Sequence, residues 1–303
     1  MPAPLRIGTR ASPLALWQAR HVSQLLTGVR NRRIEIVEIQ TAGDQVRDVP
    51  LAAIGGEGVF TKAIQDALLA NVADVAVHSL KDLPTVAAPG LVLAAVPERG
   101  PTGDALVSRK HLSFAALPQG ATLASSSLRR RAQMAHRRPD LKLVDIRGNV
   151  DTRLRKLVEQ DLDGIILAEA GLKRLGLAAD ITEVLDASWM LPAVGQGALG
   201  LECRAADAAT RTCLGQIDHA STHAAVLAER AMLRELGGGC HVPIGAAASV
   251  LNDALTIRGA VLSPDGTRRI EAQLAGKTSD ADAIGRELAA NLLAKGAREL
   301  LKG

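Results

Sequence analysis

Short apolar runs alternate with amphipathic helical patterns along the first two-thirds of the chain, and this alternation limits the fold more than any other feature. It is typical of βα units arranged around largely parallel sheets. The predicted strands are Leu5 to Gly8, Arg33 to Ile39, Asp74 to Val77, Leu91 to Val96, Leu141 to Ile146 and Gly164 to Leu167. The predicted helices are Pro13 to Leu26, Thr61 to Ala70, Leu128 to His136 and Val150 to Gln160. The predicted fold class is therefore α/β.

Two stretches rich in glycine and proline interrupt this pattern, Pro97 to Asp104 and Leu191 to Gly200. A chain that leaves one α/β lobe at the first stretch and returns at the second forms two lobes joined by a hinge. The C-terminal segment has another character, with a helix from Ala224 to Leu236, strand-like runs and a closing helix from Asp280 to Leu301, and it predicts a small α+β domain. We expect domain 1 over residues 1–98 and 197–216, domain 2 over 99–196 and domain 3 over 217–303.

Charge and composition narrow the class of partner. The chain has 27 arginines against 9 lysines and a net charge of +4, and guanidinium groups bind carboxylate or phosphate through paired hydrogen bonds. Aromatic residues make up 1% of the chain, too few for base stacking, so we expect no nucleic-acid partner. No apolar run approaches the roughly 20 residues of a membrane span, and the start MPAPLRIGTR lacks the apolar core of a secretory signal. We expect a cytoplasmic protein without a membrane partner.

Three predicted strand-to-helix junctions place hydroxyl or amide side chains beside arginines at the start of a helix. Unpaired N–H groups and the positive end of the helix dipole favour anions there. One such junction is ordinary helix capping, but three at the carboxyl ends of strands predict a cleft for several anionic groups. The residues are Arg10 and Ser12, then Ser126, Ser127, Arg129 and Arg130, then Arg147, Asn149, Thr152 and Arg153.

The segment from Ala73 to Pro84 runs from a buried strand into Lys81 and Asp82. A carboxylate beside a cationic cleft can stabilise a developing cation and move a proton. By spacing alone, a simpler account is favoured, in which Asp82 pairs with Lys81 or caps a turn. We expect His78, inside the strand, to be a core residue or to support its neighbours rather than to react.

Three cysteines (Cys203, Cys213 and Cys240) share no metal-ligand spacing and predict neither a disulfide framework nor a metal site. Cys240 lies on a glycine loop after a helix, which could present it to a ligand, but the end of a helix does not lower a thiol pKa. Taken alone, it is best interpreted as inert. The stretch Gly195 to Gly200 matches GxGxxG, but Pro192 breaks the strand that should precede it, so no dinucleotide site is predicted.

These motifs, taken together and in this order, resemble the porphobilinogen deaminase family along essentially the whole chain. The matching stretches are RIGTRASPLALWQA, ADVAVHSLKDLPT, SSLRRRAQ, RGNVDTRL, ILAEAGLKRLG, LPAVGQGALGLECR, AERAMLRELGGGCHVPIG and GARELL. The resemblance implies two lobes like those of type II periplasmic binding proteins and a third domain that carries the cofactor cysteine. It also implies a transferase of tetrapyrrole biosynthesis that condenses four porphobilinogen molecules into hydroxymethylbilane and releases ammonia.

The resemblance also assigns roles to residues of this chain. It implies a dipyrromethane cofactor joined through a thioether to Cys240, a catalytic Asp82, and a monomer. It implies that the carboxylates of the cofactor are bound by Lys81, Ser127, Arg129 and Arg130. It implies that the carboxylates of substrate and growing chain are bound by Arg10, Ser12, Arg147, Arg153 and Arg174.

Two further expectations concern residues outside these motifs. The family often has lysines in the stretch matching Leu51 to Phe60, where this chain has Ala53 and Glu57, so a lid there would be less cationic. Arg137 and Arg138 are expected to face solvent. The alternative to the enzyme is a non-enzymatic, two-lobed carboxylate-binding protein.

Overall fold

The structure is a computed structural model that describes residues 4–29, 33–41, 61–238 and 242–301. The chain forms two compact units. Unit 1 contains Met1–Arg99 and Ala198–His223, and unit 2 contains Gly100–Gly197 and Ala224–Gly303. The chain passes from unit 1 to unit 2 after Arg99 and returns to unit 1 after Gly197. Both points lie inside the two stretches rich in glycine and proline.

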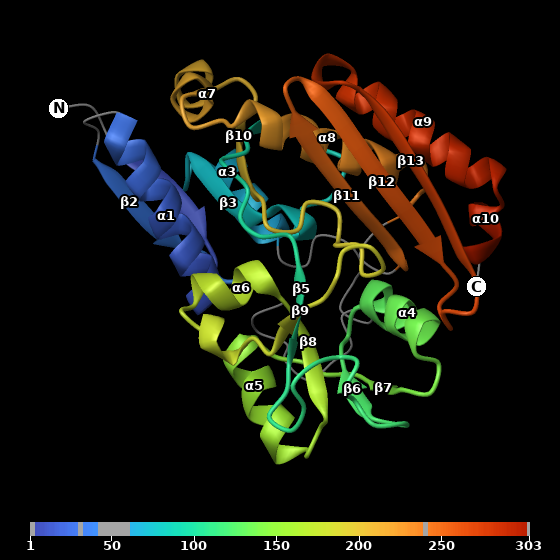
Figure 1. Cartoon of the computed structure of the whole chain (residues 1–303). Coiled ribbons are helices and arrows are strands. Elements are labelled where there is room, and N and C mark those ends of the chain that lie inside the picture. The colour runs from blue at the N-terminus through green and yellow to red at the C-terminus, as the bar shows by residue number, and fades with distance from the viewer. Residues whose placement is uncertain (1–3, 30–32, 42–60, 239–241, 302–303) are drawn as a thin grey trace. The chain divides into compact units, whose positions relative to one another are not determined.

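Unit 1 is built on a five-stranded sheet with the order β2-β1-β3-β10-β4 (Figure 1). Strand β10 runs antiparallel to both of its neighbours, and the other four strands share one direction. The strands are β1 (Leu5–Thr9), β2 (Ile34–Glu38), β3 (Val75–Ser79), β4 (Leu91–Ala95) and β10 (Leu199–Arg204).

Helices cover both faces of this sheet. Alternate residues of a strand point to opposite faces, so Val75 and Val77 pack with residues of α1 and α7 while Ala76 packs with α3. Strand β3 is thus buried on both faces, as its nearly continuous apolar sequence predicts. The helices are α1 (Pro13–Val29), α3 (Lys62–Leu69), the 3₁₀ helix η2 (Leu80–Asp82) and α7 (Ala208–Gly215).

Unit 2 contains a second five-stranded sheet, with the order β7-β6-β8-β5-β9. Here β5 is the strand that runs against the others. Helix α4 packs on one face, and α5 and α6 pack on the other. The elements are β5 (Asp104–Val107), β6 (Thr122–Ala124), α4 (Leu128–Arg137), β7 (Lys142–Val144), α5 (Val150–Glu159), β8 (Gly164–Ala168), α6 (Glu169–Arg174), η3 (Ala178–Asp180) and β9 (Glu183–Val184).

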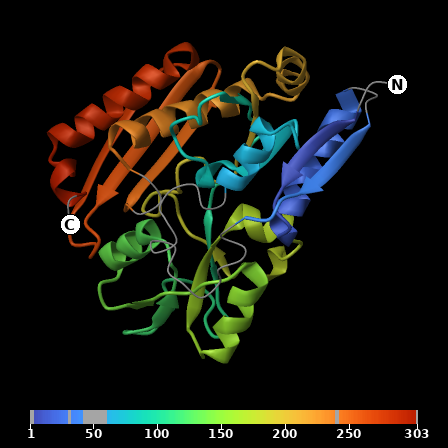
Figure 2. The same ribbon diagram turned by 180° about the vertical axis from the view of Figure 1, so that it is seen from behind.

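The C-terminal part of unit 2 is an antiparallel three-stranded sheet with two long helices. Figures 1 and 2 both show α9 lying along this sheet, and apolar residues of α8 and α9 form one core with it. Helix α8 begins in unit 1 and continues into unit 2. The elements are α8 (Ala220–Glu235), β11 (Ile244–Leu251), β12 (Ala254–Leu262), β13 (Arg269–Lys277), η4 (Thr278–Asp280), α9 (Ala281–Ala294) and α10 (Ala297–Leu300).

The predicted fold class is confirmed, with two α/β sheets followed by a small α+β part. The prediction of one closing helix is wrong, because Gly296 takes a φ of +95°, the left-handed conformation that ends helices, and separates α9 from α10. Sequence patterns also missed five strands, β5, β6, β9, β10 and β13. Within the described ranges, no helix has both the length and the apolar character needed to cross a lipid bilayer.

A partly buried ion cluster joins strands of unit 1 to the segments around them. Arg6 donates to Asp74 through its backbone N–H and its guanidinium, and Arg204 donates to the same carboxylate over 2.9 Å. Burial alone would raise the pKa of Asp74, but the hydrogen bonds from Arg6 and Arg204 outweigh it and lower the pKa to about 2. The ionised carboxylate therefore stabilises the sheet near neutral pH.

We expect Asp74→Asn to lower the free energy of unfolding at pH 7 by ~2 kcal/mol, because two arginines lose a charged acceptor. The wild-type contribution is complete above the ordinary carboxyl pKa of about 4 and is lost as the pH falls toward about 2. Urea unfolding at pH 7 and pH 3 measures both effects, with the exposed Asp66→Asn as control. Equal urea midpoints for wild type and Asp74→Asn at pH 7 would contradict this account.

Candidate active site

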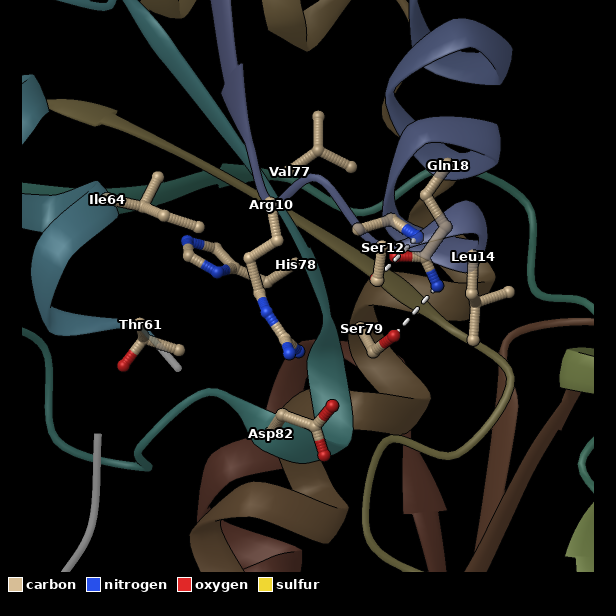
Figure 3. Close-up of a pocket in the computed structure, with 11 residues that line it drawn as sticks. Arg10, Ser12, Leu14, Gln18, Thr61, Ile64, Val77, His78, Ser79 and Asp82 are labelled. Atoms are coloured by element: carbon tan, nitrogen blue, oxygen red, sulfur yellow. Dashed lines mark hydrogen bonds between the residues drawn. The ribbon is translucent and has the colours of Figure 1, made fainter. Parts of the chain in front are cut away.

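A pocket opens in unit 1 at the carboxyl ends of β1 and β3 (Figure 3). These strands are parallel neighbours, so the segments that follow them meet at one edge of the sheet. The pocket brings together an arginine, hydroxyl groups, a histidine and a carboxylate. Its lining residues are Arg10, Ser12, Leu14, Ala15, Gln18, Thr61, Ile64, Val77, His78, Ser79 and Asp82.

The start of α1 forms one wall of this pocket. Ser12 Oγ accepts from the N–H of Ala15, as expected for a residue that caps a helix. One turn along, Gln18 donates from Nε2 to Ser79 Oγ over 2.7 Å, which fastens α1 to the end of β3. These two hydrogen bonds hold Ser12, at the start of α1, next to the end of β3.

Asp82 lies at the end of η2, immediately after β3, and its side chain is exposed at the pocket. The N–H of Leu80 donates to the carbonyl of Ala198, so the start of this short helix is tied to β10. Figure 3 shows the guanidinium of Arg10 pointing toward the carboxylate of Asp82. The structure thus brings together three predicted site residues, Arg10, Ser12 and Asp82, and Lys81 precedes Asp82 on the same helix.

Behind the pocket wall, His78 meets a buried acidic residue. Its Nε2 lies 3.0 Å from Oε2 of Glu202, and both side chains are almost fully buried. The distance suits an ion pair, although the ring N–H is not directed along a hydrogen bond. Gln65 donates to both carboxylate oxygens of Glu202. His78 is therefore a supporting residue that also lines the pocket, in agreement with the sequence prediction.

In unit 2, the junction between β6 and α4 carries the second predicted anion site. Ser127 caps α4, with its Oγ accepting from the N–H of Arg130. Ser126 donates to the carbonyl of Ile146 over 2.5 Å, and Ser125 accepts from the N–H of Ser127. The cap predicted from the sequence is confirmed, and it leaves the first turn of α4 at the carboxyl end of β6.

Arg129 and Arg130 point into unit 2 and share one acidic partner. Arg129 Nη1 donates to Asp104 Oδ2 over 2.6 Å, and Arg130 Nε donates to Oδ1 over 2.8 Å. Both guanidinium groups are nearly buried, and the side chain of Asp104 is fully buried. Burial alone would raise the pKa of Asp104, but the two positive charges outweigh it and lower the pKa below its ordinary value.

The third junction, between β7 and α5, lies beside the second because β6 and β7 are parallel neighbours. Asn149 caps α5 by accepting from the N–H of Thr152. Arg153 donates from Nε to the carbonyl of Gly148 over 2.8 Å, which places its side chain at the start of the helix near Arg147. Two predicted substrate-binding arginines therefore flank one helix start.

Two other arginines differ in their surroundings. Arg174 Nη2 donates to the carbonyl of Gly197 over 2.6 Å, and burial lowers its pKa to about 10. Arg138 is only partly exposed, because its guanidinium pairs with Asp140 and donates to the carbonyl of Leu117. Arg137 is exposed, as predicted.

Cys240 and the stretch from Leu51 to Phe60, with Ala53 and Glu57, lie outside the described residues. The two described cysteines, Cys203 and Cys213, are both buried in the core of unit 1. Burial raises the pKa of the Cys203 thiol to about 11. Within the described ranges, no three histidine, cysteine, aspartate or glutamate side chains are placed to hold a metal ion.

The arginine cluster at α4 has the chemistry of a site for a carboxylate-bearing group. It holds two guanidinium groups against one carboxylate, and among the described residues Nε of Arg129 is a buried donor without a hydrogen-bond partner. A buried donor without a partner destabilises a protein, and a carboxylate oxygen is its strongest acceptor. The residues present therefore fit an acidic cofactor.

Two α/β sheets of matching strand order and an appended α+β part define a protein with lobes of the type II periplasmic-binding-protein class. Residues 5–212 match "Porphobilinogen deaminase, dipyromethane cofactor binding domain", and residues 223–294 match "Porphobilinogen deaminase, C-terminal domain". The chain belongs to the porphobilinogen deaminase family. It is therefore a transferase of porphyrin biosynthesis with a dipyrromethane cofactor, and the alternative of a non-enzymatic binding protein is set aside.

Relatives match the whole chain. The porphobilinogen deaminase of Syntrophotalea carbinolica is 52% identical over 298 residues, covering 98% of this chain and 95% of the relative. That of Acidithiobacillus ferrooxidans is 50% identical over 303 residues, covering 100% of this chain and 98% of the relative. Among solved structures, the methionine binding protein MetQ matches 70% of this chain and 89% of its own, with 14% identity and a TM-score of 0.46.

Sequence reasoning missed several residues that support the site. Gln18 and Glu202 hold the wall of the unit 1 pocket, and Asp104 holds the arginines of unit 2. Asp104 is a buried acidic residue at the first position of a strand, and such a residue does not extend the apolar pattern that predicts the strand. The sequence therefore gives no reason to assign Asp104 to the strand rather than to the preceding loop. For Glu202 the sequence does offer a signal, because it is an acidic residue within the mostly apolar strand LGLECR.

We expect Arg130→Leu to lower the fraction of purified protein that carries the cofactor by roughly tenfold or more, since a charged hydrogen bond is lost. The exposed Arg137→Leu, at the last residue of the same helix, should match wild type. Intact mass of the denatured proteins measures the fraction. Equal fractions in the two variants would mean that the anion site lies elsewhere.

Proposed function

We propose that this enzyme joins four porphobilinogen molecules head to tail, releases one ammonia as each C–C bond forms, and then frees linear hydroxymethylbilane from the cofactor by hydrolysis, in which one water supplies the hydroxyl group. The observation that carries the proposal is the unit 1 pocket, where Asp82 follows β3 and Arg10 and Ser12 follow the adjacent parallel strand β1. Porphobilinogen carries an aminomethyl group and two carboxylates, so its site needs acidic and basic side chains close together. This pocket offers both.

Asp82 is the catalytic residue in this proposal. As ammonia leaves, the carbon that carried it becomes electron-poor, and a carboxylate already in place stabilises the developing positive charge. The same carboxylate can accept a proton during the condensation. The hydrogen bond from the N–H of Leu80 to the carbonyl of Ala198 holds the turn that carries Asp82. The carboxylate of Asp82 therefore needs little reorientation before reaction.

The basic residues bind the carboxylates of substrate and growing chain. Arg10 and Ser12 do so in the pocket of unit 1. Arg147 and Arg153 do so at the start of α5, where both side chains flank a helix N-terminus. Arg174 is the further arginine of this group.

We propose that dipyrromethane is joined to Cys240 through a thioether and that its carboxylates are held by Lys81, Ser127, Arg129 and Arg130. When bound, the cofactor supplies the pyrrole to which the first substrate is joined. The other two cysteines support this choice, since both are buried. The buried, unpartnered Nε of Arg129 supports a carboxylate ligand at α4.

We also propose three domains, over residues 1–98 and 197–216, 99–196 and 217–303, because each then contains one of the three sheets. The enzyme would act as a cytoplasmic monomer, with no nucleic-acid partner and no membrane partner. Sedimentation of the purified protein checks the monomer, and cell fractionation checks the compartment. A dimer or a membrane fraction would overturn those two statements without touching the reaction.

The attachment site is tested by the intact mass of the denatured protein. We expect wild type and the buried control Cys213→Ala to carry an adduct of two porphobilinogen-derived units. Cys240→Ala should show the bare polypeptide mass. A bare mass for wild type that persists after incubation with porphobilinogen would overturn the proposed function.

Asp82→Asn separates catalysis from cofactor assembly. We expect turnover to fall by roughly a hundredfold or more, as for loss of a charge-stabilising and proton-accepting group, while the adduct on Cys240 remains. Hydroxymethylbilane formation and intact mass are measured on the same preparation. Wild-type turnover in this variant would remove Asp82 from the reaction.

A further inference from the structure

Asp104 is the centre of a buried polar cluster in unit 2. It is the first residue of β5, and its carboxylate accepts from Arg129, Arg130 and Gln196. The three donor atoms lie 2.6, 2.8 and 2.9 Å from its oxygens. An ionised carboxylate that is fully buried needs such donors, because burial without them is strongly unfavourable.

The charges in this cluster do not cancel. Arg129 and Arg130 contribute two positive charges, Asp104 contributes one negative charge, and Gln196 is neutral. Among the described residues, Asp104 is the carboxylate that pairs with these two guanidinium groups. One buried positive charge is left over, and the same cluster contains the unpartnered Nε of Arg129. A single additional carboxylate would neutralise this charge and could accept a hydrogen bond from this Nε.

The cluster also fixes where the two guanidinium groups lie. Arg129 donates to the carbonyl of Leu191 and Arg130 to that of Ile166, so each guanidinium is held by backbone as well as by Asp104. Gln196 donates to the carbonyls of Thr102 and Gly103, which precede Asp104 on the chain. Both guanidinium groups are therefore held in place before any ligand arrives, which lowers the entropic cost of binding.

We propose that Asp104 is a positioning residue for the cofactor, which aims Arg129 and Arg130 and neutralises one of their two charges, so that the cluster accepts one ligand carboxylate. This inference rests on the proposed function. Asp104 touches neither substrate nor reacting atoms and acts through the arginines. The four residues of the cluster leave one positive charge uncompensated, so binding of one cofactor carboxylate also stabilises unit 2.

The test removes the negative charge of Asp104 and keeps the shape of its side chain. In Asp104→Asn the cluster keeps two positive charges and loses the carboxylate that aims them. We expect the cofactor-bearing fraction of folded protein to fall roughly tenfold, as for the loss of one charged hydrogen bond. The matched control is Asp140→Asn, which removes the acidic partner of Arg138 in the same unit and should load like wild type.

A second variant guards against a folding defect. Asp104→Glu keeps the negative charge of the cluster, and we expect it to fold and to load better than Asp104→Asn. Circular dichroism reports folding, and intact mass after incubation with porphobilinogen reports loading. If Asp104→Asn is folded and loads like Asp140→Asn, the proposal is wrong. If Asp104→Glu loads no better than Asp104→Asn, or neither folds, Asp104 has only a structural role.

The cofactor-free background gives an independent readout. In Cys240→Ala, we expect a lower melting temperature than in loaded wild type, and Asp104→Asn should lower it further. A wild-type protein that never gains the adduct would refute the proposed function itself. A wild type that loads, beside an Asp104→Asn that loads equally well, refutes only the role of Asp104.

Discussion

Each five-stranded sheet depends on one antiparallel strand that enters it directly after the chain has passed between the units. Strand β5 begins a few residues after Arg99, and β10 begins just after Gly197. Each occupies the fourth place in its sheet, between strands that run the other way. The backbone hydrogen bonds of these strands fix where β3 and β8 end, and Asp82 and Arg174 follow those ends. The other candidate residues follow β1, β6 and β7, which do not pair with β10 or β5.

The geometry of the sites follows from this pairing. In unit 1, β10 pairs along β3 up to Ser79, and the next N–H, of Leu80, donates to Ala198. The turn that carries Asp82 is thereby placed against the start of α1. In unit 2, the first residue of β5 is Asp104, so the strand that completes the sheet also supplies the acidic partner of the α4 arginines.

The two passages of the chain approach each other closely within unit 2. The N–H of Gly100 donates to the carbonyl of Gly197, and a Cβ on Gly197 would come within 2.5 Å of the carbonyl oxygen of Gly100. Gly197 also has a φ of +85°, which glycine adopts without strain. Gly197, the second glycine of GQGALG, therefore serves close backbone packing.

The amino-acid sequence by itself determined the fold class, the main helices and the residues that begin α4 and α5. These depend on local periodicity and capping, as at Ser127 and Asn149, which neighbouring residues specify. The order of motifs also determined the family.

What only the tertiary structure decided is which charges meet, such as Asp104 with Arg129 and Glu202 with His78. These partners are at least 25 residues apart along the chain, and only sheet register brings them together.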